Sequence, residues 1–180
     1  SEVPPRCETK KIPGVNNSQA GAGDQFRIDC FYQNITTWGP KASNFILDVK
    51  QRSKYSVQCL TEVHLEANKL SDFRTNMKRH YLDDFSAPAV KMDSGGCHAG
   101  STILTSQVLY SIPIAADVLN QIVDFNDCKP QWVAVEVRCR GMSFLQICSY
   151  FDCGTKLGAA NWAQIQQICC LIFCYDLPFV

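Results

Sequence analysis

The chain has 180 residues, of which 46% are hydrophobic and 19% are charged, so it can form one domain with a buried core and is not a largely disordered protein. Acidic and basic residues are equal in number, and the net charge of +0 gives no electrostatic signature of binding to nucleic acid or to an anionic membrane. No run reaches the about 18 consecutive apolar residues that a membrane helix requires.

The first half of the chain predicts an arm followed by three strands. Residues 1–24 are rich in proline, glycine and asparagine, and we expect them to form an N-terminal arm or loop; residues 25–180 form a single α+β domain. Alternating apolar residues predict strands over residues 25–33, 45–50 and 54–66. The short polar break between the last two strands favours a hairpin.

From residue 67 the apolar period changes from two to about 3.6, which predicts a helix over residues 67–84. A loop over 86–101, a strand over 103–110 and a helix over 113–126 follow. Residues 131–139 and 144–151 alternate as a second hairpin, and residues 159–172 predict a third helix, with a buried strand over 168–173 as the alternative. We therefore expect an α+β fold: an antiparallel sheet of about five or six strands with two or three helices packed on one face.

Eleven cysteines are dispersed along the chain without any Cys-x-x-Cys spacing, which favours disulfides over metal sites and indicates an oxidising compartment. Because eleven is odd, one thiol is expected to be unpaired. A reducing compartment with buried, inert thiols is the alternative. Sequons at Asn16 and Asn34 predict glycosylation. The expected disulfide residues are Cys7, Cys30, Cys59, Cys97, Cys128, Cys139, Cys148, Cys153, Cys169, Cys170 and Cys174.

Two groups of residues have the chemistry of a reactive site. Glu62, His64 and Glu66 are spaced so that a strand would project all three from one face, where they could bind a divalent metal or transfer protons. Cys97 and His98 lie in a glycine-flanked loop that could present a thiol nucleophile. A solvated sheet face and a half-cystine are the favoured interpretations, so we predict no catalytic residue, no metal and no cofactor.

Three functions fit these observations. The favoured one is a secreted or surface-exposed, disulfide-rich recognition protein without evident catalysis, located outside the cell or in a periplasmic or lumenal oxidising compartment. The first alternative is a structural subunit of an extracellular or viral assembly. The second is a hydrolase that uses Glu62, His64 and Glu66 or the Cys97–His98 loop. The expected partner is another protein or a copy of the chain itself, with no nucleic acid and no membrane span.

Overall fold

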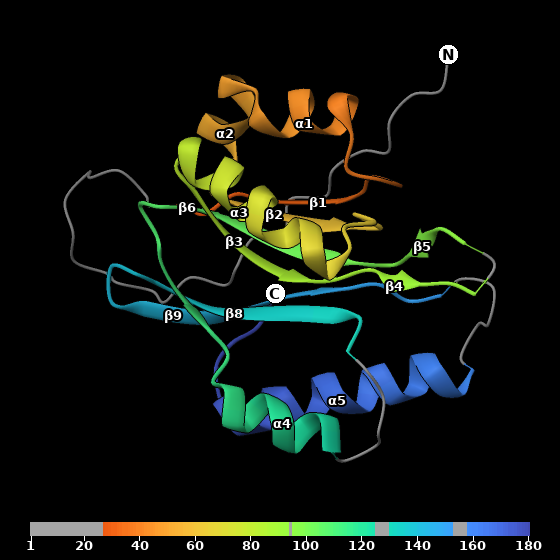
Figure 1. Ribbon diagram of the computed structural model, residues 1–180. Coiled ribbons are helices and arrows are strands. Elements are labelled where there is room, and N and C mark those ends of the chain that lie inside the picture. The colour runs from red at the N-terminus through yellow and green to blue at the C-terminus, as the bar shows by residue number, and fades with distance from the viewer. Residues whose placement is uncertain (1–26, 94, 125–129, 153–157) are drawn as a thin grey trace.

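The computed structural model describes residues 27–180 except 94, 125–129 and 153–157, and in this part of the chain two β-sheets pack face to face (Figure 1). The first sheet has the strand order β1-β2-β6-β3, and the second has the order β7-β8-β9. β1 and β2 are parallel, so the first sheet is mixed, whereas the second is antiparallel. The α+β class is confirmed, but a single antiparallel sheet was the wrong expectation. The strands are β1 (Cys30–Asn34), β2 (Val57–Thr61), β3 (Leu82–Ala87), β6 (Ser101–Ser106), β7 (Tyr110–Pro113), β8 (Trp132–Cys139) and β9 (Met142–Ser149).

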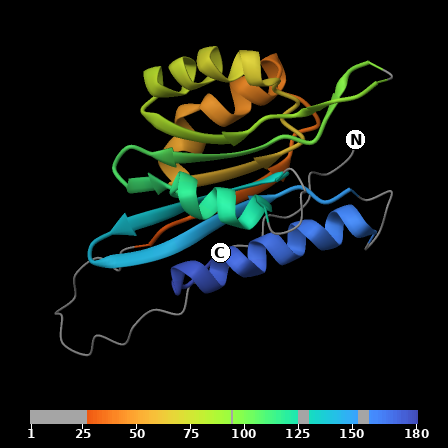
Figure 2. The ribbon, with the colours of Figure 1, turned by 60° about the horizontal axis from the view of Figure 1, so that its bottom comes forward.

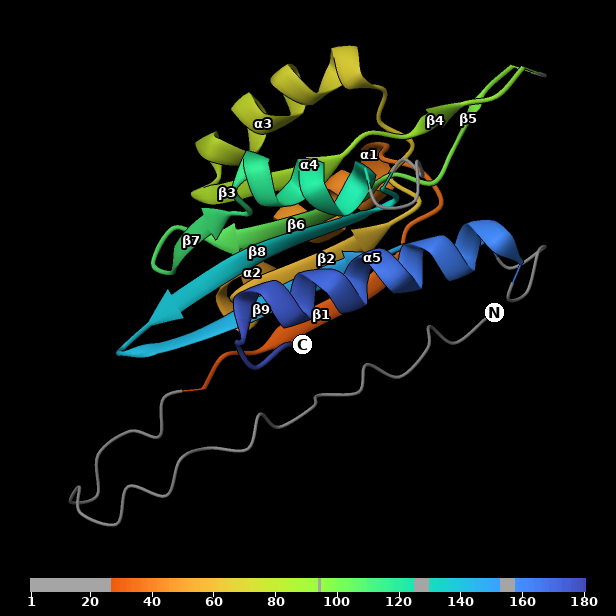
Figure 3. The ribbon, with the colours of Figure 1, turned by 90° about the horizontal axis from the view of Figure 1, so that it is seen from below.

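Helices cover the outer faces of both sheets, as the views in Figures 2 and 3 show. Over the first sheet lie α1 (Pro40–Leu47), α2 (Val49–Lys54) and α3 (Leu70–Arg79), the last preceded by the short 3-10 helix η1 (Ala67–Lys69). Over the second sheet lie α4 (Ala116–Asp124) and α5 (Ala159–Tyr175). A small hairpin, β4 (Val90–Lys91) and β5 (Cys97–His98), projects from one end. The expectation of helices on one face is wrong because each sheet has two apolar faces to bury.

The segment between β1 and β2 is helical, where a strand over residues 45–50 was expected. Pro40 occupies the first turn of α1, where its fixed backbone angle favours a helix. The Asp48 carboxylate accepts a hydrogen bond of 2.8 Å from the Lys50 N–H and so caps the start of α2. This helical crossover returns the chain to its starting edge, and β2 therefore pairs parallel with β1 instead of forming the predicted hairpin.

Other boundaries differ from the sequence-based expectation in informative ways. The strand expected over residues 54–66 ends at Thr61, and the helix expected to reach residue 84 ends at Arg79 and is followed by β3. The hairpin of β8 and β9 and the helix α5 are confirmed. None of the described helices has the combination of length and hydropathy that crossing a membrane requires.

The core between the two sheets is apolar. On β8, Val135 and Val137 face the first sheet, whereas Trp132 and Ala134 pack against α4 and α5, as the alternation in the sequence predicts. The inter-sheet core consists of Val57, Cys59, Ile103, Leu109, Val135, Val137, Phe144 and Cys148. This packing, and no covalent bond among the described residues, holds the two sheets together.

Every described cysteine is a free thiol, so the predicted disulfide framework is wrong for these residues. Cys59 on β2 and Cys148 on β9 lie inside the inter-sheet core, and burial, followed by the neighbouring Cys148 thiol, raises the pKa of Cys59 well above its usual value. The free thiols are Cys30, Cys59, Cys97, Cys139, Cys148, Cys169, Cys170 and Cys174. The predicted arm over residues 1–24, the sequon at Asn16, and Cys7, Cys128 and Cys153 lie outside the described residues.

The thiols should differ strongly in reactivity. Cys169 and Cys174 are exposed on α5, whereas Cys59 and Cys148 are 1% and 3% exposed. We expect the α5 thiols to alkylate rapidly in the native protein and the core thiols to alkylate only after unfolding, because the reagent cannot reach a thiol buried between the sheets and because burial also raises the pKa of Cys59. Peptide mapping after timed alkylation without reductant measures both rates. Core cysteines that resist alkylation even in denaturant would show that they are bridged.

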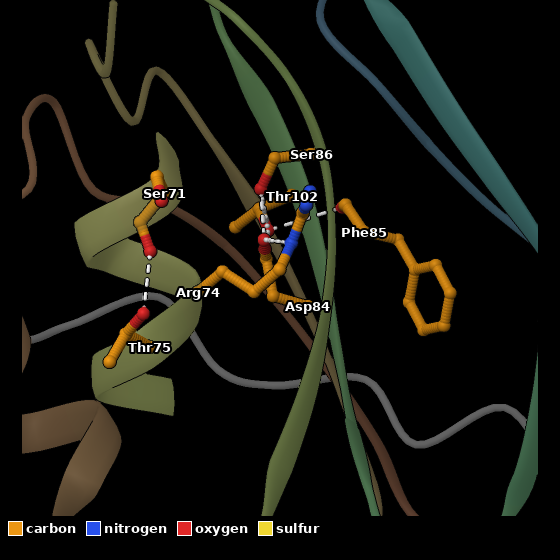
Figure 4. A network of polar contacts seen from close by, with 7 residues as sticks. All are labelled: Ser71, Arg74, Thr75, Asp84, Phe85, Ser86 and Thr102. Carbon is orange, nitrogen blue, oxygen red and sulfur yellow. Dashed lines mark hydrogen bonds and ion pairs between the residues drawn. The ribbon is translucent and has the colours of Figure 1, made fainter. Parts of the chain in front are cut away.

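A polar network lies between β3, β6 and α3 (Figure 4). The Asp84 side chain is buried, and its Oδ1 lies 2.5 Å from the Ser86 hydroxyl and 2.8 Å from the Thr102 hydroxyl. Its Oδ2 has no hydrogen-bond partner and lies 3.6 Å from the Arg74 guanidinium. Burial raises the pKa of Asp84, while the two hydroxyls and Arg74 act in the opposite direction.

This network predicts a pH-dependent effect of substitution at Asp84. Because its folded pKa is raised, the protonated carboxyl stabilises the fold below the unfolded pKa of about 3.9, and this contribution is lost as the pH rises through the folded pKa. Asp84→Asn should therefore gain stability relative to the natural protein between pH 4 and pH 7. Asp84→Ala should lose about 1–3 kcal/mol, because it removes the acceptor of two hydroxyls. Urea unfolding at both pH values measures these differences, and the opposite trend for Asp84→Asn would show that the Arg74 ion pair dominates.

Candidate functional site

The carboxyl ends of β1, β2, β3 and β9 meet at one end of the sandwich, on the right in Figure 1. Asn34 at the end of β1 is level with Thr61 at the end of β2. Ser101 at the start of β6 pairs with Thr61 on one side and with Ala87 on the other. The Gln131 carbonyl accepts hydrogen bonds from the Ser101 hydroxyl (3.0 Å) and from the N–H of Tyr150, which follows β9.

The loops that leave these strands are joined by backbone hydrogen bonds. The Trp38 N–H donates to the Val63 carbonyl over 2.8 Å and thereby links the loops after β1 and β2. The N–H groups of Val63 and His64 donate to the carbonyls of Gly100 (3.2 Å) and Ala99 (3.3 Å). Segments 34–38, 61–65 and 99–101 therefore form one connected layer, although they are far apart in the sequence.

Left-handed backbone is concentrated in this layer. Among the described non-glycine residues, seven have a positive φ, and four of them lie here: Thr36 (63°), Glu62 (54°), His64 (55°) and Ala99 (61°). Each such residue costs about 1–2 kcal/mol relative to the right-handed conformation. Strain of this kind persists where the surrounding structure enforces it, and it is concentrated at functional sites. We refer to Asn34, Thr36, Glu62, His64 and Ala99 as the strand-end cluster.

Three polar side chains of the strand-end cluster can act on a ligand. Asn34 is exposed, and its Oδ1 accepts a hydrogen bond of 3.0 Å from the Thr36 N–H, which fixes the turn after β1. Glu62 and His64 are half-buried, directly after β2. A carboxylate, an imidazole and an amide at one strand end provide a cation ligand, a proton carrier and a hydrogen-bond donor or acceptor.

The predicted face of Glu62, His64 and Glu66 does not form, because the chain leaves extended geometry at Glu62. Glu66 instead precedes η1 and makes a 3.6 Å ion pair with Lys69. In the part of the chain that the structure describes, no three His, Cys, Asp or Glu side chains are grouped closely enough to hold a metal ion by themselves. A cation bound by Glu62 would need oxygen ligands from elsewhere.

The second sequence candidate, Cys97 and His98, occupies β5 and not an open loop. Successive side chains of a strand point to opposite faces, so the imidazole of His98 is not placed to activate the Cys97 thiol. This pair therefore does not provide a nucleophile and its base.

Sequence reasoning missed three features of the site. Asn34 was predicted only as a glycosylation acceptor, and Ser101 and Gln131 were not identified. A local pattern cannot find them, because their proximity to Glu62 depends on the parallel register of β1 with β2 and on the pairing of β6. The positive φ of Glu62 has no signature in the sequence either, since glycine is the residue that normally marks such a position.

No protein-family model matches the chain, and no curated protein is similar to it in sequence. Two solved structures have a related arrangement. The endonuclease domain of TRAS1, a telomere-specific non-LTR retrotransposon, superposes with a TM-score of 0.45 and 13% identity over 77% of this chain and 51% of that chain. The human Nocturnin catalytic domain with bound sulfate anion gives a TM-score of 0.44 and 13% identity over 77% and 54%. The chain spans about half the length of these structures.

The prediction of a secreted, disulfide-rich recognition glycoprotein is corrected at its covalent premise, because the eight described cysteines are free thiols. The alternative of a structural subunit of an assembly is set aside with it. The localisation, the domain boundary at residue 25 and the sequon use at Asn34 stay predictions.

The strain at Glu62 predicts an unusual response to glycine. Glu62→Gly should raise the free energy of unfolding by about 1 kcal/mol, because glycine adopts φ 54° without the steric penalty of a Cβ. Glu66→Gly is the matched control. Glu66 is also half-buried but has φ −66°, so glycine relieves no strain there and should not raise stability. Urea unfolding of both variants measures the difference, and equal destabilisation would contradict strain at Glu62.

Proposed function

We propose that this protein is a divalent-metal-dependent hydrolase of phosphoesters whose active site is the strand-end cluster. The observation that carries the proposal is the coincidence of Asn34, Glu62 and His64 with four left-handed residues at the carboxyl ends of a parallel strand pair. Carboxyl ends of parallel strands are the usual place for a ligand in α/β sheets, and enforced strain there favours a functional role over a solvated loop.

The donor set indicates which metal and which substrate fit. Glu62 supplies one carboxylate, and no group of three acidic, histidine or cysteine side chains forms a protein cage for a metal among the described residues. Mg²⁺ is commonly bound by one or two carboxylates together with water and substrate phosphate oxygens, whereas zinc requires three or four protein ligands. A single carboxylate therefore fits Mg²⁺ bound jointly with a phosphoester. When bound, the ion would neutralise charge on the phosphoryl oxygens.

The other residues have roles that follow from their positions. The Asn34 amide retains an N–H₂ group when its Oδ1 accepts from Thr36, and this group can donate to a phosphate oxygen. The half-buried His64 can carry a proton to or from the reacting group. The hydrogen bonds of Val63 and His64 to segment 99–100 support the left-handed conformation of Glu62, so the backbone that carries the carboxylate is held before a ligand arrives.

The test compares two glutamates of similar exposure on one segment. Glu62→Gln removes the charged ligand while keeping shape, and it should lower Mn²⁺ or Mg²⁺ affinity and hydrolysis by about 100-fold or more. Glu66→Gln should leave both within about twofold, because Glu66 only pairs with Lys69 on the surface. Calorimetric titration with Mn²⁺ and turnover of bis-p-nitrophenyl phosphate, p-nitrophenyl phosphate and a short oligonucleotide measure these effects.

The outcomes separate the hypotheses. Equal loss in both variants, or a natural protein that binds no divalent ion and cleaves none of the esters, would overturn the proposal. Cleavage of the oligonucleotide would also overturn the expectation that the protein binds no nucleic acid, and turnover of the small esters alone would support a small phosphoester as substrate.

A further inference from the structure

Helix α5 presents a row of buried amide side chains to the second sheet. Asn161, Gln164 and Gln167 are 5%, 3% and 0% exposed and are spaced about one helical turn apart. Amides so deeply buried need hydrogen-bond partners, and an apolar residue at each position would have packed against the sheet at less cost. Their partners therefore indicate what the row is for.

Each amide of the row binds a different segment: the residues after β9, the residue before β8, or β8 itself. Asn161 holds the backbone of Asp152 with both ends of its amide: Oδ1 accepts from the N–H over 3.0 Å and Nδ2 donates to the carbonyl over 2.8 Å. Gln164 Oε1 accepts from the backbone N–H of Gln131 over 2.8 Å. Gln167 Oε1 accepts from the indole N–H of Trp132, inside the core, over 2.9 Å.

Gln164 is connected through Gln131 to the strand-end cluster. Gln131, which it holds, accepts the Ser101 hydroxyl at its own carbonyl over 3.0 Å. Ser101 directly follows Ala99 and Gly100. The carbonyls of these two residues accept hydrogen bonds from the N–H groups of His64 and Val63, the two residues that follow Glu62. A continuous series of hydrogen bonds and short backbone segments thus runs from α5 to the loop that carries Glu62.

We propose that Gln164 is a positioning residue for the active site and acts through Gln131 and Ser101 on the left-handed loop at Glu62. The proposal rests on the proposed function. Glu62 and His64 keep a strained backbone only while segment 99–101 offers its carbonyls in place, and Ser101 fixes that segment to Gln131. Removing the Gln164 acceptor leaves the Gln131 N–H unpaired and free to turn toward water, which loosens the support beneath Ser101.

Gln167 is the matched control. It lies on the same face of the same helix, is similarly buried, and its Oε1 accepts from the Trp132 indole on the α5 side of the core. Gln164→Met and Gln167→Met remove one amide acceptor each and keep the length of the side chain, so both should lower thermal stability by similar amounts. The two variants should differ in hydrogen exchange and Mn²⁺ affinity at the strand-end cluster.

The experiment measures hydrogen exchange by mass spectrometry over residues 62–66 and 99–101, together with Mn²⁺ affinity and the kcat and KM of ester hydrolysis. Gln164→Met should speed exchange in both segments by about tenfold and weaken Mn²⁺ binding by about tenfold, a typical effect of residues that support a ligand. Gln167→Met should leave exchange in those segments and Mn²⁺ affinity unchanged. Equal effects of the two variants at the site, or none from Gln164→Met, would overturn the proposal.

A double-mutant cycle checks the route. Ser101→Ala should reproduce the site effects of Gln164→Met, and the double variant should add little to either, because both interrupt one series of contacts. Additive effects would overturn transmission through Ser101. Hydrogen exchange needs neither metal nor substrate, so failure of the proposed function, seen as absent metal binding in the natural protein, is distinguished from failure of the positioning role, seen as unchanged exchange in Gln164→Met.

Discussion

The parallel pairing of β1 with β2 is the constraint on which the rest of the structure depends. Parallel neighbours cannot be joined by a tight turn, so residues 35–56 must cross over the sheet, and they do so as α1 and α2 on its outer face. The same pairing brings the ends of both strands, Asn34 and Thr61, to one edge. β6 then pairs antiparallel with β2 and starts at that edge, which delivers Gly100 and Ser101 to the loop that carries Glu62. The candidate site is a direct product of this topology.

Apolar packing between two sheets supplies the rigidity that the strained loops require. Val57, Ile103 and Val135 are fully buried between the sheets, and a chain of this length has enough core to be stable without covalent bridges. Cys59 and Cys148 take part in that packing as small hydrophobic residues. Packing therefore explains the buried thiols Cys59 and Cys148, and the structure gives none of the described cysteines a role as a disulfide staple.

Features that depend on local pattern could be predicted, and features that depend on pairing partners could not. The alternation of Val133, Val135 and Val137 identified β8 as a strand with an apolar face, and the helical period identified the start of α3 and most of α5. Residues 45–50 looked like a strand because a short apolar run fits either structure, whereas Pro40 in the first turn of α1 and the Asp48 cap of α2 favour helices. Glu62 and His64 were selected for a strand face that does not exist, yet they lie in the candidate site because they directly follow a strand.

The strain of the left-handed backbone at the site explains why the contacts that support it extend as far as α5. Left-handed Glu62 and His64 would relax if segment 99–101 moved, so that segment must be held by contacts stronger than the strain. The buried hydroxyl of Ser101 binds the Gln131 carbonyl, and the buried amide of Gln164 binds the Gln131 N–H. Burying each of these polar groups costs desolvation free energy. Polar groups at these positions are a poor choice for stability alone, since apolar residues would pack without that penalty. Their presence makes sense where orientation matters more than stability, and the orientation they fix is that of the loop beside the carboxylate of Glu62.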